Sequence, residues 1–331
     1  MQRRNFNQIL LRSAVFTTMS PMSFPHKNSA IPVLKPGMKV ALIAPAGPVF
    51  PERLDKALAN MESLGLIPVV NRGVVLNQYG YLAGPDADRL ADLHAAFSRS
   101  DVDVVWCIRG GYGCTRLLPA VNYRLIKKSK KPLIGFSDVT ALHLAFAHHG
   151  IRHTIHGPVA SATFTAFTLS QVQEALFLPP HPFTIPSADS HQGLSYVIHS
   201  GQAEGQLTGG NLSLLAALCG TAYRFSFKHK IVFLEDVGEK PYRLDRIITQ
   251  LLQSTNLADA AGIVLGIFAD CEPDEGDPSL SLRAMLEDKL KPLGIPTFYG
   301  LSFGHVDDNC CLPYHQLARL DATQQSLTLL A

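Results

Sequence analysis

A regular alternation of apolar strands and amphipathic helices is the feature that most constrains the fold of this chain. Residues 38–47, 66–75, 102–111 and 130–136 are short apolar runs that predict strands. Between and after them, residues 51–65, 86–103, 115–129 and 138–150 carry apolar residues at helical spacing. Strand and helix in alternation predict an α/β fold, with a mostly parallel sheet flanked by helices on both faces.

The sequence pattern divides the chain into two α/β units. Residues 35–160 form an N-terminal domain, and residues 161–202, rich in Pro, Ser and His, lack periodicity and are expected to be a linker. Residues 203–331 then repeat the strand and helix patterns and end in short strands, which predicts a second, mixed α/β domain.

Residues 1–34 differ from the rest of the chain. Arg3 and Arg4 precede a mildly apolar stretch, as in a twin-arginine export signal, but Arg12 interrupts that stretch and no clear cleavage site follows. We expect residues 1–34 to be such a signal or a disordered extension.

Composition excludes several classes of function. The formal net charge is only +2 and no basic tract is present, so we expect no nucleic-acid partner. No run of about 18 apolar residues predicts a membrane span. The six cysteines form no C-x-x-C pair, and the histidines between positions 148 and 156 lack the spacing of a zinc site, so we expect free thiols and no metal. The acidic loop 270–277 departs from a calcium-binding loop in its glycine, and Pro273 interrupts it.

Three turns follow predicted strands, at residues 44–47, 109–113 and 135–138. Ligands of such sheets bind beyond the carboxyl ends of the strands, where these turns meet. Ser137 lies on the third turn, between a strand and a helix. It is either a helix N-cap or a nucleophile on a sharp elbow, although the usual second glycine of G-x-S-x-G is missing.

The glycine-rich turn 109–113 has three interpretations. It could cradle a phosphate, donate N–H groups to an oxyanion, or form a tight turn that needs positive φ. It lacks both the P-loop Lys-Ser/Thr and a full G-x-G-x-x-G, so nucleotide binding has weak support.

A nucleophilic serine needs a base, usually histidine, oriented by a carboxylate. Glu235 and Asp236 directly follow an apolar strand, and His305 follows another strand and a glycine. Each alone could equally be a turn or surface residue, so spacing leaves these assignments open.

Six segments together resemble the L,D-carboxypeptidases, the muramoyltetrapeptide carboxypeptidase family of serine peptidases. They occur in the order found in that family and span roughly residues 35–320. The segments are VALIAPAGPV, IRGGYGCTRLLP, LIGFSDVTALH, GQLTGGNLSLL, VFLEDVGEKPYRLDR and GLSFGHVDDNCCLP.

The resemblance implies a Ser-Glu-His triad at the interface of the two domains. Ser137 matches the family nucleophile, Glu235 its acid and His305 its base. The backbone N–H groups of Asp138 and Gly111 match the oxyanion hole. We name Arg109 and Asn211 as candidate substrate-binding residues, with Arg109 a candidate for the terminal carboxylate.

The resemblance also implies the substrate. We expect hydrolysis of the bond between meso-diaminopimelate and D-alanine in murein tetrapeptides during peptidoglycan recycling, without cofactor, by a homodimer. We expect the protein to be cytoplasmic, as in the family, or periplasmic if the signal at Arg3 and Arg4 functions. The same family includes the microcin C immunity peptidases. A peptidyl-nucleotide substrate of that type would favour an aromatic residue placed to stack an adenine, whereas Trp106, the single tryptophan, lies in a predicted strand. A non-catalytic nucleotide-binding protein is the other alternative.

Overall fold

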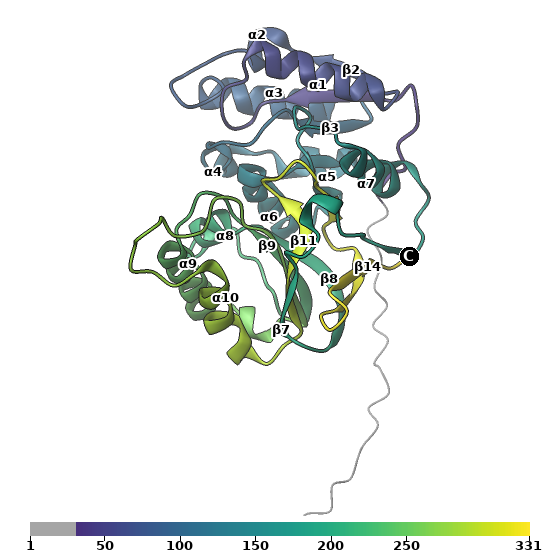
Figure 1. The fold of residues 1–331 in the computed structure, drawn as a ribbon. Coiled ribbons are helices and arrows are strands. Elements are labelled where there is room, and N and C mark those ends of the chain that lie inside the picture. The colour runs from purple at the N-terminus through teal and green to yellow at the C-terminus, as the bar shows by residue number, and fades with distance from the viewer. Residues whose placement is uncertain (1–30) are drawn as a thin grey trace, which may run out of the picture.

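The computed structural model describes residues 31–331, which form two sheets covered by helices (Figure 1). The export-like signal at Arg3 and Arg4 lies outside the described residues. Within residues 31–331, no helix is both long enough and apolar enough to cross a membrane.

The first sheet has six strands in the order β12-β5-β4-β3-β1-β2, and all neighbours run parallel except β12, which is antiparallel to β5. Its strands are β1 (Lys39–Ile43), β2 (Ile67–Val70), β3 (Val104–Cys107), β4 (Leu133–Gly135), β5 (Thr154–His156) and β12 (Leu312–Pro313). The mostly parallel N-terminal sheet is therefore confirmed. Because β12 comes from the C-terminal half, the chain returns to the first sheet near its end.

Helices cover both faces of this sheet. Alternate residues of each strand point to opposite faces, and apolar side chains on both faces pack against helices. On β1, Val40 and Leu42 belong to the apolar cluster that includes α1, whereas Ala41 and Ile43 belong to the cluster that includes α3. The helices of this half and the following segment are α1 (Pro51–Ser63), α2 (Arg72–Val75), α3 (Asp86–Ser98), α4 (Cys114–Leu117), α5 (Tyr123–Ser129), α6 (Thr140–His148) and α7 (Ala166–Phe177).

The second sheet is mixed, in the order β6-β14-β13-β8-β9-β10-β11-β7. Its central strands β8 to β11 are parallel, and the outer strands are antiparallel to their inner neighbours. Its elements are β6 (Phe183–Thr184), β7 (Tyr196–His199), β8 (Gln202–Asn211), α8 (Leu212–Leu218), β9 (Lys230–Glu235), α9 (Pro241–Ser254), β10 (Gly262–Ile267), α10 (Leu282–Leu290), β11 (Thr297–Gly304), β13 (Leu317–Asp321) and β14 (Ser326–Leu329).

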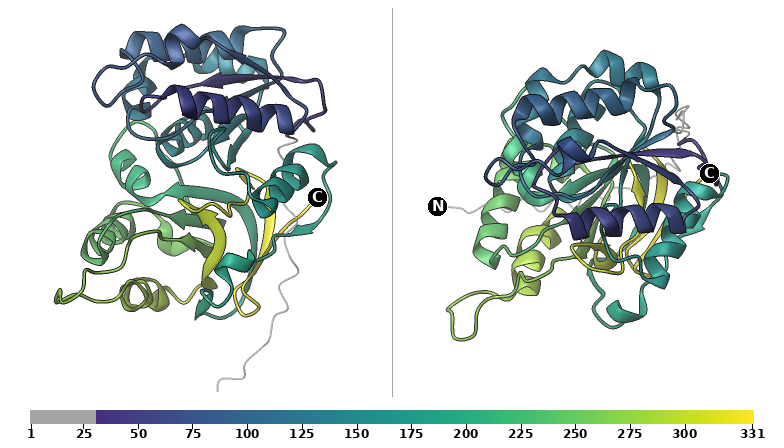
Figure 2. Two further views of the ribbon diagram at one scale, coloured as in Figure 1. Left: turned by 45° about the horizontal axis from the view of Figure 1, so that its top comes forward. Right: turned by 90° about the horizontal axis from the view of Figure 1, so that it is seen from above.

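The two halves pack against each other through a continuous apolar cluster, which extends from α3 and α6 to the strands of the second sheet. Residues 140–146 of α6 are all buried, as expected for a helix enclosed on every side. The left view of Figure 2 shows the purple and blue N-terminal elements stacked on the green C-terminal ones. The start of α6 is therefore held rigidly between the two halves.

Three local expectations differ from the structure. The expected linker 161–202 contains α7, β6 and β7. The expected strand 66–75 ends at Val70, and its second part forms α2. The expected helix 115–129 is two helices, α4 and α5, because a 3₁₀ turn containing Pro119 and an extended Val121 separate them.

Candidate active site

Ser137 occupies a strained turn between β4 and α6. Its φ of +62° lies in the left-handed region, which costs a non-glycine residue on the order of 1–2 kcal/mol. The N-cap of the 3₁₀ turn 137–139 is Phe136 and that of α6 is Val139, so Ser137 is the N-cap of neither. Instead, Oγ lies 2.9 Å from Nε2 of His305. The structure therefore favours the elbow over the N-cap interpretation.

His305 is held in place by a buried carboxylate. Its Nδ1 lies 2.7 Å from Oε2 of Glu235, the last residue of β9, whose side chain is fully buried. His305 directly follows Gly304 at the end of β11. At Gly304 a Cβ would lie 2.7 Å from the carbonyl oxygen of Ile267 and φ is +122°, so the turn that presents the imidazole needs glycine.

The environment of His305 favours its charged form. Burial acts against the imidazolium as the largest single effect, but the hydrogen bond and charge of Glu235, with the charge of Asp236, outweigh it and raise the pKa of His305. The arrangement can therefore take a proton from Ser137 and stabilise the resulting cation.

Asp236, next to the acid, has a different environment. Its carboxylate accepts hydrogen bonds from Nδ2 of Asn211 at 3.0 Å and from the N–H and hydroxyl of Ser213 at 2.9 and 2.8 Å. Burial, followed by the charge of Glu235, raises the pKa of Asp236. The side-chain oxygen of Asn211 accepts from the Leu214 N–H and so caps α8. The Asn211 amide is buried, and both its nitrogen and its oxygen have protein partners. Asn211 thus holds Asp236 and caps α8 rather than presenting its amide to solvent.

The glycine-rich loop 109–113 lies against Ser137 and against the loop after β1. A Cβ at Gly110 would lie 3.0 Å from Oγ of Ser137, and one at Gly111 would lie 3.0 Å from Cα of Gly47. The Gly47 N–H donates to the Gly110 carbonyl at 3.2 Å. Within the described chain, the Gly111 N–H has no protein acceptor. This close packing requires glycine at both positions and leaves the Gly111 N–H available to a ligand.

Arg109 lies at the same edge, with part of its guanidinium already bonded. Nη1 donates to the carbonyl of Pro48 at 2.9 Å and Nε to that of Gly110 at 3.1 Å. Burial, with the charge of Arg53, lowers the pKa of Arg109. Arg109 thus places positive charge at the loop, and the charge of Arg53 is close enough to act on it, as recognition of an anion requires.

Sequence reasoning missed Arg89 and the side chain of Asp138. Both are 1% exposed. Arg89 precedes Leu93, Ala96 and Phe97 by four, seven and eight residues, so the signal was a charged residue on the apolar face of α3. For Asp138 only the backbone N–H was considered, and no local pattern predicts that its carboxylate turns inward.

Aromatic side chains near the loops are tyrosines rather than the single tryptophan. Trp106 is fully buried and donates to the carbonyl of Pro158 at 2.8 Å. By contrast, Tyr81 and Tyr112 are exposed, with ring centroids 5.7 Å apart. Trp106 is thus excluded from stacking on a ligand, whereas this tyrosine pair could do so.

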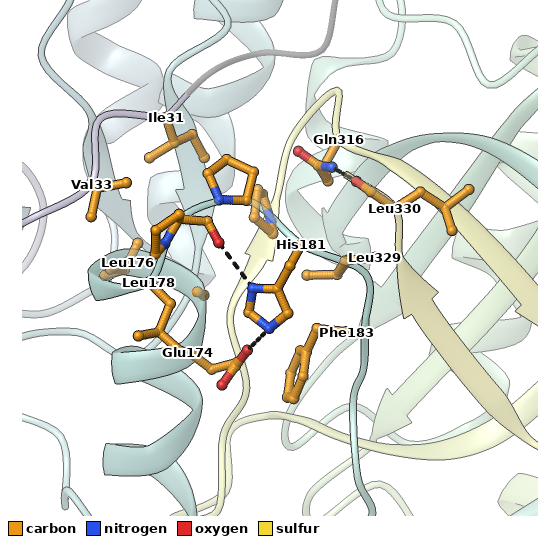
Figure 3. Close-up of a pocket in the computed structure, with 14 residues that line it drawn as sticks. Ile31, Val33, Glu174, Leu176, Leu178, His181, Phe183, Gln316, Leu329 and Leu330 are labelled. Atoms are coloured by element: carbon orange, nitrogen blue, oxygen red, sulfur yellow. Dashed lines mark hydrogen bonds and ion pairs between the residues drawn. The ribbon is translucent and has the colours of Figure 1, made fainter.

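Neither the histidines between positions 148 and 156 nor an apolar pocket beside α7 adds to this chemistry. Among residues 31–331, no three His, Cys, Asp or Glu side chains converge as metal ligands. Figure 3 shows a pocket between α7 and the C-terminal strand, with the ion pair of Glu174 and His181 beside apolar side chains. None of Ser137, Glu235 and His305 lines it.

Comparison with known proteins matches both halves of the chain to one family. Residues 40–157 match the LD-carboxypeptidase N-terminal domain, and residues 204–320 match the LD-carboxypeptidase C-terminal domain.

Full-length relatives agree with these matches. The murein tetrapeptide carboxypeptidase of Pseudomonas aeruginosa is 37% identical over 300 residues, covering 86% of this chain and 94% of that protein. The crystal structure of muramoyltetrapeptide carboxypeptidase from Oxalobacter formigenes has a TM-score of 0.77 at 30% identity, covering 88% and 98% of the two chains. An MccF-like protein from Bacillus anthracis has a TM-score of 0.80 at 26% identity, covering 91% and 99%.

Proposed function

This chain belongs to the LD-carboxypeptidase family, and we propose that it is a serine carboxypeptidase that removes the terminal D-alanine of murein tetrapeptides. The observation that carries the proposal is the chain of hydrogen bonds from Ser137 through His305 to Glu235, at 2.9 and 2.7 Å. A role in peptidoglycan recycling follows from the proposed substrate.

In the proposed mechanism, His305 takes the proton of Ser137 as the hydroxyl attacks the carbonyl of the penultimate residue. Glu235 holds the imidazole tautomer and stabilises the imidazolium. The N–H groups of Asp138 and Gly111 bind the oxyanion, each contributing about 3–4 kcal/mol to transition-state stabilisation. His305 then protonates the departing amine, and water hydrolyses the acyl-enzyme.

The terminal carboxylate of the substrate needs a cation. We assign this role to Arg109, which belongs to the glycine-rich loop and feels the charge of Arg53. Its Nε and Nη1 donate to backbone carbonyls, and Nη2 takes part in neither bond. An arginine fork suits a carboxylate well.

The proposal is tested by comparing two tetrapeptides that differ only in the configuration of the last alanine. Release of D-alanine, followed with D-amino acid oxidase, should greatly exceed release of L-alanine, followed by chromatography. Equal release, or no release from either peptide, would contradict the proposed specificity. Tight binding of a nucleotide without hydrolysis of either peptide would favour the non-catalytic alternative.

A second candidate is a peptidase of the microcin C immunity type. The similarity to the Bacillus anthracis structure and the exposed pair of Tyr81 and Tyr112 favour it. An aminoacyl sulfamoyl adenosine incubated with the protein would separate the two. Its cleavage at a higher kcat/KM than the tetrapeptide would establish this second activity instead.

Activity on the tetrapeptide is expected to decline in acid, because a protonated His305 cannot accept the Ser137 proton. Since the pKa of His305 is raised above its ordinary 6.5, kcat/KM should reach half its maximum at a pH above 6.5. Replacing Glu235 by glutamine removes the raising hydrogen bond and charge and should move this midpoint to lower pH. A wild-type midpoint below 6.5, or one that the substitution leaves unchanged, would contradict this assignment.

The same shift affects stability with a defined sign. The fold favours the imidazolium, so its contribution to the free energy of unfolding is fully present below the unfolded pKa near 6.5 and is lost as pH rises through the higher folded value.

Gly110→Ala should impair catalysis because the added methyl group would lie 2.9 Å from Cβ and 3.0 Å from Oγ of Ser137. We expect kcat to fall about 100-fold, the scale of a misplaced reacting group. Gly73→Ala on α2 is the matched control, because its new Cβ would approach only the Asn71 side chain, at 3.7 Å. Steady-state kinetics with the tetrapeptide measure both variants. Equal activities would show that Gly110 does not set the position of the nucleophile.

A further inference from the structure

One peptide unit beside the triad is held from both sides by buried side chains of opposite charge. The carbonyl oxygen of Gly113 accepts from Nη1 of Arg89 at 3.1 Å, and the N–H of Cys114 donates to Oδ2 of Asp138 at 2.8 Å. These two groups belong to the same peptide bond, which closes the glycine-rich loop 109–113. Arg89 and Asp138 are each only 1% exposed.

Arg89 also fixes the neighbouring loops. Its guanidinium donates to the carbonyl of Pro45, in the loop after β1, and to that of Gly84 at 3.3 Å, just before α3. Its remaining nitrogen pairs with Asp86 at the protein surface. Through these bonds, one side chain holds together three loops at the edge of the first sheet, including the two that pack against each other at Gly47 and Gly110.

Asp138 connects this assembly to the nucleophile, because it follows Ser137 directly in the elbow. Its backbone N–H is one proposed oxyanion donor, while its carboxylate fixes the loop that carries the other, at Gly111. Buried charges are weak contributors to net stability, and apolar side chains of similar size often replace them without loss. Net stability alone therefore gives little reason to bury both charges here, which points to a second role for Arg89 and Asp138.

We propose that Arg89 and Asp138 are positioning residues that set the distance between the Gly111 N–H and the hydroxyl of Ser137. The inference rests on the proposed function, because it concerns the oxyanion hole of that reaction. Oxyanion donors act when they lie about 2.7–3.1 Å from the developing charge, so a shifted loop loses transition-state stabilisation without losing substrate binding.

The test compares Asp138→Ala with Asp138→Asn, whose amide oxygen can still accept the Cys114 N–H. We expect Asp138→Ala to lower kcat for the tetrapeptide about 30- to 100-fold with KM changed less than about threefold. Asp138→Asn should restore kcat to within about fivefold of wild type, because it keeps the acceptor. Asp92→Asn is the matched control on α3, since Asp92 has no bond to these loops, and it should behave as wild type.

A second readout does not depend on the peptide substrate. The rate at which a fluorophosphonate probe modifies Ser137 should fall in Asp138→Ala by a factor similar to that for kcat. Wild-type protein that reacts with the probe but does not cleave the tetrapeptide would defeat the proposed function, while the probe rates would still test the positioning role.

Two outcomes would overturn the inference. One is a folded Asp138→Ala variant with kcat and probe rate within threefold of wild type. The other is a loss confined to KM, which would indicate substrate binding. If Asp138→Ala does not fold, Arg89→Lys replaces it, because a lysine cannot reach all three loop carbonyls. We expect kcat about 10-fold below wild type, and wild-type rates in the folded variant would refute the role.

Discussion

Replacing Ser137 with alanine is expected to lower tetrapeptide turnover by about 10⁶-fold, because the proposed acyl-enzyme cannot form without the hydroxyl. The fold should survive, since among residues 31–331 Oγ bonds only to His305, and Val139 rather than Ser137 is the N-cap of α6. Steady-state kinetics and thermal unfolding measure the two effects. Ser254→Ala, at an exposed hydroxyl on α9, is the matched control and should retain wild-type turnover.

Ser137→Gly provides a further check on the elbow. It removes the same hydroxyl, but glycine adopts the positive φ of +62° without strain. The free energy of unfolding of Ser137→Gly should therefore be about 1 kcal/mol higher than that of Ser137→Ala. Turnover in Ser137→Ala within tenfold of wild type would exclude this serine as the nucleophile. Equal stabilities of the two variants would show that the turn is not strained.

Replacing Glu235 with glutamine is expected to lower kcat about 10³- to 10⁴-fold. A glutamine amide is nearly the same size as the carboxylate. It can donate as well as accept a hydrogen bond, so it does not fix the tautomer in which Nδ1 of His305 carries the proton. It also carries no charge to stabilise the imidazolium. KM should change little, because Glu235 is fully buried and does not contact substrate in the proposed mechanism.

The control for this substitution lies one residue away. Asp236→Asn also neutralises a buried carboxylate, but one bonded to Asn211 and Ser213 rather than to His305. We expect a lower midpoint of thermal unfolding and a much smaller loss of kcat. The reverse result, with Glu235→Gln active and Asp236→Asn inactive, would transfer the role of the acid to Asp236.

Local patterns predict most elements of the first domain because each strand ends in a turn that interrupts its apolar run. They fail where tertiary contacts decide the conformation. In α7 the buried face contains Thr168 and Gln171 beside Val172 and Leu176, so no apolar stripe marks the helix. Thr168 is satisfied by donating to the Asp307 carbonyl, 139 residues away. The adjacent β-branched residues Val74 and Val75 likewise favour a strand, although packing makes them part of α2.

At the site, too, sequence reasoning predicts some features and misses others. Each member of the proposed triad follows an apolar strand, so the sequence places it at a strand end, and the family resemblance selects which strand ends belong together. The supporting contacts are beyond such reasoning. Arg89 reaches the Gly113 carbonyl and Asn211 reaches Asp236 through pairings that no spacing rule encodes.

The most direct test of the proposed function is mass spectrometry of purified murein tetrapeptide incubated with the wild-type protein and with Ser137→Ala. The proposal predicts a product lighter by one alanine residue with the wild type and unchanged peptide with the variant. Intact peptide with both proteins, cleavage at another bond, or equal loss of alanine with both would contradict it.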